Sequence, residues 1–319
     1  MAGRRAPGEL RHSVTGQLPG EVARLLDERS AARAARDWPA ADALRDRIRA
    51  LGWDAVDSAE GSTARPWLPP AAADLPSLLE EPASLSASVV LVVDDHPEDL
   101  DRLLRGLAAH LPGGSWELLI VANAPSSPIQ PLLAEAWPQD GSLPEATVLS
   151  TAGRLGWADA LNLALRRCRG AVAILLDTSL EPTGDIVTPL LAAFEDPLVG
   201  IAGGWGVTSR DGRQFLEAPP GNVDAVEGYC LAIRREALRV TGGFDGHYRF
   251  YRHADLDLSF AVRDAGWRAV RIASLPVVRH AHRGWEAHPP EERDRLSKRN
   301  FYRFLEHWRD RPDLLLNPG

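Results

Sequence analysis

The chain has 319 residues, of which 45% are hydrophobic and 25% charged, an ordinary balance for a folded globular protein. Its formal net charge of −8 argues against nucleic acid as the main partner, because duplex binding draws most of its affinity from a basic face. Cys168 and Cys230 show no disulfide or zinc spacing, and no apolar run approaches the roughly 18 residues that span a bilayer. We therefore expect a cytoplasmic protein, with peripheral contact to the inner face of the membrane as an alternative.

Residues 20–51 have the pattern of two helices. Asp37 followed by Pro39 is a helix start signal, and Gly52 is a stop signal. Two apolar stripes recur at helical spacing: Val22, Leu25 and Leu26 on one, and Trp38, Ala41, Leu44, Ile48 and Leu51 on the other. The sequence thus predicts a small α-helical hairpin within an N-terminal domain at 1–57.

This hairpin, RSAARAARDWPAADALRDRIRALGWDAVDSAEGSTARP, resembles the C-terminal helical region of bacterial cysteinyl-tRNA synthetases. In that family the region assists anticodon recognition. Acidic and basic residues nearly cancel across 21–51, however, and RNA binding draws on an excess of basic charge. We therefore expect docking to a protein or to a membrane surface, or oligomerisation, and keep an RNA-binding element as the alternative.

Residues 58–85 are rich in Pro, Ala and Ser and predict an extended linker before a second domain at 86–319. In that domain apolar strand patterns such as SASVVLVV, WELLIVAN and GAVAILLD alternate with helical patterns. This alternation predicts an α/β fold whose mainly parallel sheet is covered by helices on both faces, with ligands at the carboxyl ends of the strands. Later segments, GIAGGWGV and AVEGYCLAIRR, indicate that the sheet becomes mixed.

The stretch 242–284 places two carboxylates and two histidines around one helix and one strand. Gly242 and Gly243 predict a turn, and 254–265 is a predicted helix that begins with Asp255 and Asp257. Residues two apart on a helix are turned by about 200°, so the two carboxylates cannot share one task. A strand over WRAVRIA follows, and LPVVRHAH then carries His280 and His282 to a sheet edge or loop.

The segment GYCLAIRREALRVTGGFD at 228–245, followed by ADLDLSFAVRDAGWRAV, resembles the acceptor-side half of family 2 glycosyltransferases. The resemblance implies a GT-A-like fold with a mixed, mainly parallel sheet flanked by helices. It also places Asp255 at the position of the catalytic base, although Ala254 stands where the family has Glu.

On the acceptor side we expect Gly228, Trp205 and Asp257 at the binding site, with a structural role as a cap or paired carboxylate as the alternative for Asp257. Trp205 and Trp285 lie on predicted site loops, where a sugar face can stack on an indole. The resemblance therefore implies a glycan or a lipid-linked acceptor.

On the donor side, SVVLVVDDHPEDL matches the first strand and turn of the family, which places Asp95 at a nucleotide contact. The family has an Asp that reads the nucleobase where this chain has Ala122, and Asn123 follows it. Arg154 matches a stretch that supplies basic contacts, and a guanidinium fork binds a diphosphate well. Asp95, Asn123, Arg154 and Asp177 are thus the expected donor-binding residues.

The segment LLDTSLEP stands where the family has Asp-x-Asp, whose two carboxylates hold a divalent cation on the donor phosphates. Only Asp177 remains, with Ser179 in place of the second carboxylate and Glu181 beyond it. The expected ligands of Mg²⁺ or Mn²⁺ are Asp177, Ser179 and His280, because oxygen and imidazole ligands complete such a set. Ser179 acting through a water, Glu181 as a ligand, and another histidine within 280–282 are the alternatives.

The resemblance implies an inverting glycosyltransferase that moves a sugar from a nucleotide-sugar donor to an acceptor hydroxyl in cell-surface glycan or polysaccharide synthesis. The changes at Ala122, Ser179 and Ala254 support an alternative, a catalytically degenerate domain that binds a nucleotide or glycan or acts as a scaffold.

Overall fold

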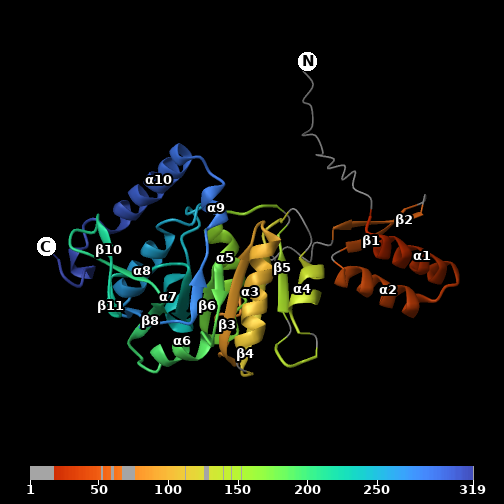
Figure 1. Cartoon of the computed structure of the whole chain (residues 1–319), viewed down its shortest axis with the longest axis horizontal. Helices are drawn as coiled ribbons and strands as arrows, with labels where there is room; N and C mark the ends of the chain where they lie inside the picture. The colour runs from red at the N-terminus through yellow and green to blue at the C-terminus, as the bar shows by residue number, and fades with distance from the viewer. Residues whose placement is uncertain are drawn as a thin grey trace, which may run out of the picture. The chain divides into compact units, whose positions relative to one another are not determined.

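The computed structural model describes residues 18–51, 53–58, 61–66, 76–111, 113–125, 129–138, 140–144, 146–151 and 153–318. The chain divides into two compact units, Met1–Trp67 and Leu68–Gly319 (Figure 1). Each unit has its own apolar core.

The first unit contains the predicted helical hairpin. Helices α1 (Gly20–Ala34) and α2 (Trp38–Ala50) pack through a small core that includes Leu25 and Ile48. The Asp37 carboxylate accepts a hydrogen bond of 3.1 Å from the amide of Ala40, which caps α2 as the start signal indicates.

A β-hairpin that the sequence analysis did not anticipate completes this unit. Strands β1 (Trp53–Ser58) and β2 (Gly61–Pro66) pair antiparallel, so part of the expected linker 58–85 is a strand. The pattern GSTARP has no apolar alternation, so nothing in it marks a strand. The buried Arg29 of α1 binds Asp57 of β1 at 2.7 Å and helps to lower the pKa of that carboxyl to about 2.

The second unit is built on an eight-stranded sheet in the order β11-β14-β8-β13-β6-β3-β4-β5. Its strands are β3 (Leu85–Val93), β4 (Trp116–Ala122), β5 (Ala146–Ser150), β6 (Gly170–Leu176), β8 (Val199–Gly203), β11 (Gly221–Val223), β13 (Cys230–Arg234) and β14 (Arg268–Arg271). Strands β5, β4, β3 and β6 are parallel, whereas β13 runs antiparallel to both β6 and β8. The sheet is therefore mixed, as the sequence predicts.

Two smaller sheets lie beside the large one. One joins β9 (Gly206–Ser209), β10 (Phe215–Glu217) and β12 (Ala225–Val226), and the other joins β7 (Leu180–Pro182) and β15 (Val277–Arg279). The pairing of β7 with β15 brings the segment after β6 next to the histidine-bearing segment, which is about a hundred residues further along the chain.

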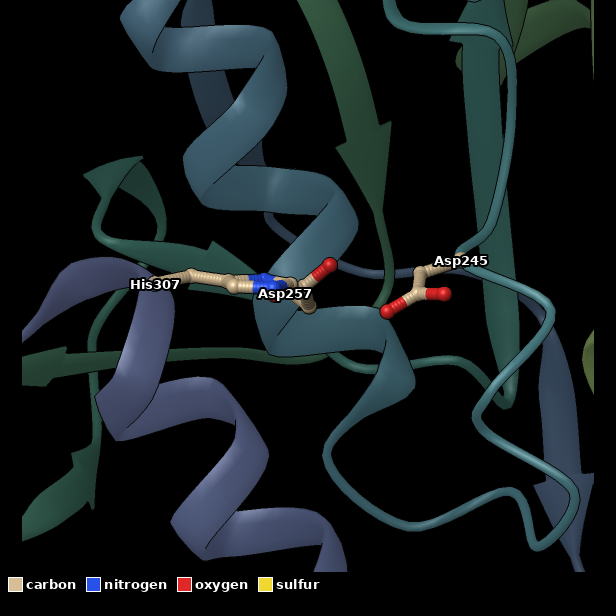
Figure 2. Close-up of side chains that lie close together, drawn as sticks. All are labelled: Asp245, Asp257 and His307. Atoms are coloured by element: carbon tan, nitrogen blue, oxygen red, sulfur yellow. The ribbon is translucent and has the colours of Figure 1, made fainter.

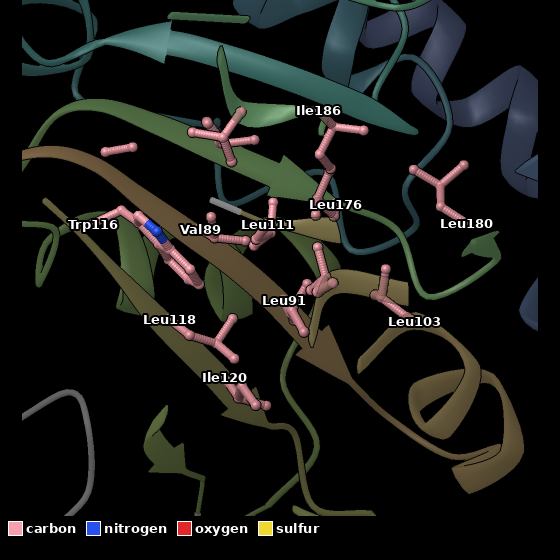
Figure 3. Packing of buried hydrophobic residues seen from close by; sticks show 14 of the residues in the cluster. Val89, Leu91, Leu103, Leu111, Trp116, Leu118, Ile120, Leu176, Leu180 and Ile186 are labelled. Atoms are coloured by element: carbon pink, nitrogen blue, oxygen red, sulfur yellow. The ribbon is translucent and has the colours of Figure 1, made fainter. Parts of the chain in front are cut away.

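Helices cover both faces of the large sheet. They are α3 (Pro97–His110), α4 (Gln130–Ala136), α5 (Trp157–Leu165), α6 (Val187–Ala193), α7 (Arg235–Thr241), α8 (Ala254–Asp264), α9 (Arg283–Glu286) and α10 (Pro290–Trp308). Alternate residues of β3 point to opposite faces, so Val89 and Leu91 pack with Leu103 of α3 (Figure 3), and Val90 packs in the cluster that holds α5 and α8.

The predicted elements of 242–284 are present. Gly242 ends α7 in the left-handed conformation with φ 78°, α8 covers Ala254–Asp264, and β14 lies within the predicted strand. No helix in the described part of the chain has the length and apolarity needed to cross a bilayer.

Candidate active site

A cavity of about 490 Å³ opens where β3 and β6 end. Its polar and aromatic lining includes Asp94, Asp95, His96, Arg154, Asp177, Thr178, Arg249, Phe250, Tyr251, His282 and His288, together with Gly228. This is the carboxyl edge of the parallel half of the sheet, where ligands bind in open α/β folds.

Two of the expected donor-binding residues, Asp95 and Arg154, line the cavity, and the third, Asn123, is bonded to its lining residues Asp94 and Leu155. Arg154 lies 3.1 Å from Asp95 and 3.3 Å from Asp94. The buried Asn123 donates a hydrogen bond of 2.6 Å to Asp94 and accepts one of 2.8 Å from the amide of Leu155. These contacts orient the side chains before a ligand arrives. Arg249 places a second guanidinium on the cavity wall, and the sequence analysis missed this residue.

Asp177 lines the cavity and contacts His282. Its Oδ2 is 3.3 Å from Nε2 of His282, and its Oδ1 accepts hydrogen bonds from the amide and hydroxyl of Ser179. Burial alone would raise the pKa of Asp177, but His282 and Ser179 outweigh it and hold that pKa below its ordinary value. The same carboxylate raises the pKa of His282 against the effect of burial.

The structure brings His282, not His280, to Asp177. His280 instead pairs with Glu181 at 2.6 Å, and its amide donates a hydrogen bond to the Ser179 carbonyl. The physical reason is the β7–β15 register, which sets Arg279 opposite Leu180 and so puts His280 beside the strand and His282 beyond it. The sequence spacing alone could not choose between the two histidines.

The loop that carries His282 is anchored to α3. Arg283 forms ion pairs with Glu98 and with Asp99, the latter at 3.4 Å, and Arg102 of the same helix donates a hydrogen bond to the Thr178 carbonyl. Asp177, His282 and the Ser179 hydroxyl thus offer one carboxylate, one imidazole and one neutral oxygen at a fixed place. These three groups are of the kind that would hold Mg²⁺ or Mn²⁺, which would supply positive charge beside a diphosphate.

Asp255 lies in the first turn of α8 and is bonded to Gly228, which lines the cavity. The Gly228 amide donates a hydrogen bond of 2.8 Å to Oδ2, and the Leu256 amide donates one of 3.0 Å to Oδ1. Burial nevertheless raises the pKa of Asp255, and burial together with Asp255 raises the pKa of Glu227. A carboxylate with a raised pKa is a suitable proton acceptor near neutral pH.

Helix α10 fixes the loop before Asp255, a role that the sequence analysis did not foresee. The buried Asn300 donates hydrogen bonds of 2.7 and 2.8 Å to the carbonyls of Phe250 and Arg252. His253 adopts φ 68° and packs against Phe301, and burial lowers its pKa to about 4. The Asn in the middle of this helix is the sequence signal that could have suggested such a contact, because Asn is unfavourable in helix interiors.

Asp257 points away from the cavity, toward α10. It is 6% exposed and accepts hydrogen bonds of 2.9 Å from His307 and 2.8 Å from Trp308. Figure 2 shows His307 and Asp257 in contact, with Asp245 across from them. The Asp245 carboxylate accepts hydrogen bonds from the backbone amide of His247 and from Arg303, and it also contacts the His247 ring. Protein partners therefore already satisfy this carboxylate. The structure therefore corrects the expected acceptor contact of Asp257 to a link between α8 and α10.

Trp205 lies beside Tyr229, with ring centroids 6.0 Å apart, and the Arg279 guanidinium lies over both rings. Gly228 precedes Tyr229 and lines the cavity. Gly228 thus lines the cavity and binds Asp255, whereas Trp205 packs on Tyr229 and is not part of the described cavity lining.

The mixed sheet, the acidic donor side and the Asp–His pair at the strand ends define the chain as a GT-A-type α/β protein. Residues 88–258, more than half of the chain, match the family model described as glycosyl transferase family 2, and the chain belongs to that family. Residues 15–58 match the cysteinyl-tRNA ligase anticodon binding domain.

Curated relatives include two groups, cysteine–tRNA ligases and proteins named for glycan synthesis. A cysteine–tRNA ligase of Methanosarcina mazei is 47% identical over 45 residues, which cover 14% of this chain and 10% of that protein. An N-acetylglucosaminyl-diphospho-decaprenol L-rhamnosyltransferase of Mycobacterium tuberculosis is 37% identical over 76 residues, 24% of each protein. The O-antigen biosynthesis protein RfbC of Myxococcus xanthus is 23% identical over 226 residues, 60% of this chain and 17% of that protein. The chain thus spans a quarter or less of each of these relatives.

Two solved structures share the fold. GalNAc-T7 with UDP, GalNAc and Mn²⁺ superposes with a TM-score of 0.60 at 18% identity, covering 72% of this chain and 50% of that one. A mannosyltransferase of Pyrobaculum calidifontis with GDP-Man and Mn²⁺ gives 0.52 at 18% identity, covering 83% and 70%. These likenesses confirm the GT-A fold.

Proposed function

We propose that this chain is an inverting glycosyltransferase that moves a sugar from a nucleotide-sugar donor to an acceptor hydroxyl in cell-surface glycan synthesis. The observation that carries the proposal is that three segments meet at one cavity. Asp177 from the end of β6 and His282 from the loop before α9 line it, and Asp255 of α8 is bonded to its lining residue Gly228. The names of the rhamnosyltransferase and O-antigen relatives support the glycan assignment.

In the proposed reaction the acceptor oxygen attacks the anomeric carbon from the face opposite the leaving group. One carbon–oxygen bond forms, the bond to the nucleoside diphosphate breaks, and Asp255 takes the acceptor proton. A single in-line displacement inverts the configuration at that carbon.

Asp95, Asn123 and Arg154 would hold the nucleotide part of the donor, and Asp177 and His282 would face its diphosphate. A divalent cation bound by these two residues beside Ser179 would offset the charge of the departing diphosphate. Ser179 is 3% exposed, and its hydroxyl is already bonded to Asp177.

The competing function is a degenerate domain that binds a nucleotide or glycan, or a scaffold without turnover. Ala122 in place of the base-reading Asp, Ser179 in place of the second Asp, and Ala254 before the base favour it.

Calorimetric titration of the full chain with UDP and GDP, with and without Mn²⁺, separates these functions. Binding that depends on Mn²⁺, followed by release of nucleoside diphosphate from the matching sugar nucleotide, supports the enzyme. Binding without turnover supports the degenerate domain, and absence of binding in all conditions supports a scaffold.

We propose that the chain is cytoplasmic and that its first unit docks to a protein or to the inner face of the membrane. Its helices carry paired charges such as Arg24 with Glu28 and Arg45 with Asp54, which leaves little unopposed basic surface. Retention of tRNA by the full chain in a filter-binding assay at moderate salt would instead favour the RNA-binding alternative.

A further inference from the structure

The carboxylate of Asp99 is buried in the first turn of α3 and pairs with two guanidiniums. The residue is 4% exposed. Its Oδ1 lies 2.8 Å from Nη2 of Arg102, and its Oδ2 lies 3.4 Å from Nε of Arg283. A buried carboxylate costs free energy unless it is paired, and here each oxygen has a positively charged partner. Asp99 therefore fixes the positions of two arginines relative to each other.

Each of these arginines leads to one of the two segments that meet at Asp177. The Nη2 of Arg102 also donates a hydrogen bond of 3.4 Å to the carbonyl of Thr178, the residue that follows Asp177. Arg283 follows His282 directly in the chain. One buried carboxylate thus connects the backbone beside Asp177 with the residue beside His282.

The backbone pairing of the two segments stops short of Asp177 and His282. Strand β7 pairs with β15, and the amide of His280 adds one more hydrogen bond, to the Ser179 carbonyl. Asp177 and His282 each lie two residues beyond that bond. Asp99 and its two arginines therefore tie the segments together at the point where the strand pairing no longer does.

Helix α3 is a firm support for this tie because it packs closely on β7. A Cβ at Gly106 of α3 would lie 2.8 Å from the carbonyl oxygen of Pro182 in β7. Leu103 and Leu107 of the same helix are fully buried in the large apolar core. A movement of α3 against the segment that carries Asp177 would therefore disturb close-packed atoms.

Resting on the proposed function, we propose that Asp99 is a positioning residue for the two side chains that would hold the cation of the donor complex. We call Asp99, Arg102 and Arg283 the α3 clamp. The clamp keeps Asp177 and His282 in contact with each other, and Asp99 acts on them through the two arginines.

Hydrogen exchange of the full chain tests the clamp without metal or nucleotide. In Asp99→Asn the amide hydrogens of 177–181 and 280–287 should exchange about tenfold faster, because a neutral amide binds the two guanidiniums more weakly. The matched control is Asp101→Asn, since Asp101 lies on the same helix and pairs with Arg105 at 2.9 Å. Unchanged exchange in Asp99→Asn, or equal acceleration in the control, overturns the inference.

Mn²⁺ affinity tests what the clamp serves. Asp99→Asn should weaken Mn²⁺ binding by about tenfold or more in the presence of UDP or GDP, measured from the EPR signal of free Mn²⁺. Raising the Mn²⁺ concentration should restore nucleotide affinity to within about twofold of the unaltered chain, because the variant has lost cation affinity alone. A general loss of stability would lower nucleotide affinity at every Mn²⁺ concentration. Normal Mn²⁺ affinity, or a nucleotide loss that Mn²⁺ does not restore, shows the inference to be wrong.

A second variant, Arg283→Ala, covers the case in which Asp99→Asn does not fold. The Arg283 side chain is 38% exposed, and without it Asp99 still keeps Arg102 as a partner. Faster exchange should then be confined to 280–287, with a similar loss of Mn²⁺ affinity. In the double variant the loss should be smaller than the sum of the two single losses, because both changes break the same contact. Additive losses, or normal exchange in Arg283→Ala, contradict the inference.

The same measurements separate this inference from the proposed function. If Asp99→Asn binds Mn²⁺ and nucleotide normally, the inference is wrong while the proposed function stands. Failure of the unaltered chain to bind Mn²⁺ or nucleotide contradicts the proposed function itself, and hydrogen exchange then decides for or against the clamp alone.

Discussion

The backbone amide of Gly228 donates a hydrogen bond of 2.8 Å to Oδ2 of Asp255, across 27 residues of sequence. The bond fixes one oxygen of the carboxylate against the cavity wall. It also stabilises the charged form, although burial still keeps the pKa of Asp255 above its ordinary value.

The first prediction concerns the reaction. Asp255→Asn should lower turnover at least about a hundredfold, because the amide cannot accept the acceptor proton. Nucleotide affinity should stay within about twofold, since Asp255 lies apart from the donor residues. Release of nucleoside diphosphate from sugar nucleotides measures turnover, with Asp264→Asn, at the exposed end of the same helix, as control. Near-normal turnover in Asp255→Asn would remove this residue from the mechanism.

The second prediction concerns stability and pH. A carboxyl whose pKa is raised by folding stabilises the protein at low pH and loses that contribution as pH rises through its folded value. Asp255→Asn should therefore raise the melting temperature at neutral pH, by about 2 °C, from removal of a buried charge. The gain should shrink as pH falls through the raised folded pKa and be lost below the ordinary pKa of an aspartate. Thermal unfolding at a series of pH values from neutral to below that ordinary pKa checks it, and a gain that grows toward low pH contradicts the sign.

The third prediction separates the two histidines. His282→Ala should weaken Mn²⁺-dependent nucleotide binding by about tenfold or more, because it removes the imidazole beside Asp177. His280→Ala is the matched control two residues away, and its pairing with Glu181 gives it no such contact. Titrations with and without Mn²⁺ measure both. The opposite order of effects would return the metal role to His280.

The fourth prediction concerns α10. Asn300→Ala should lower kcat/KM for the acceptor by about tenfold or more, because it frees the carbonyls of Phe250 and Arg252 and lets the loop before Asp255 shift. Nucleotide affinity should remain unchanged, a split that general destabilisation would not produce. Arg299→Ala, at an exposed arginine on the same helix, serves as control. Parallel loss of acceptor and nucleotide binding would show that Asn300 acts only through stability.

The sequence predicts the parts of this molecule that depend on local periodicity and strand order. The α8 boundaries and the mixed sheet follow from apolar spacing, and the edge that carries Asp177 follows from parallel strand geometry. The choice between His280 and His282 does not follow, because it depends on the register of β7 with β15.

The role of Asn300 and the direction of Asp257 also lie beyond sequence patterns. Both depend on how α10 packs against α8, a contact between residues about fifty positions apart. The strand β2 has no sequence signature for a similar reason, since its partner β1 supplies the apolar side of the hairpin.

Helix α10 and its neighbour α9 lie after residue 258, where the match to the family model ends. Asp177 and Asp255 lie before that point, whereas His282, which contacts the first, and Asn300, which holds the loop before the second, lie after it. Exchange of this short terminal segment alone would therefore change the surroundings of both carboxylates while leaving the sheet intact.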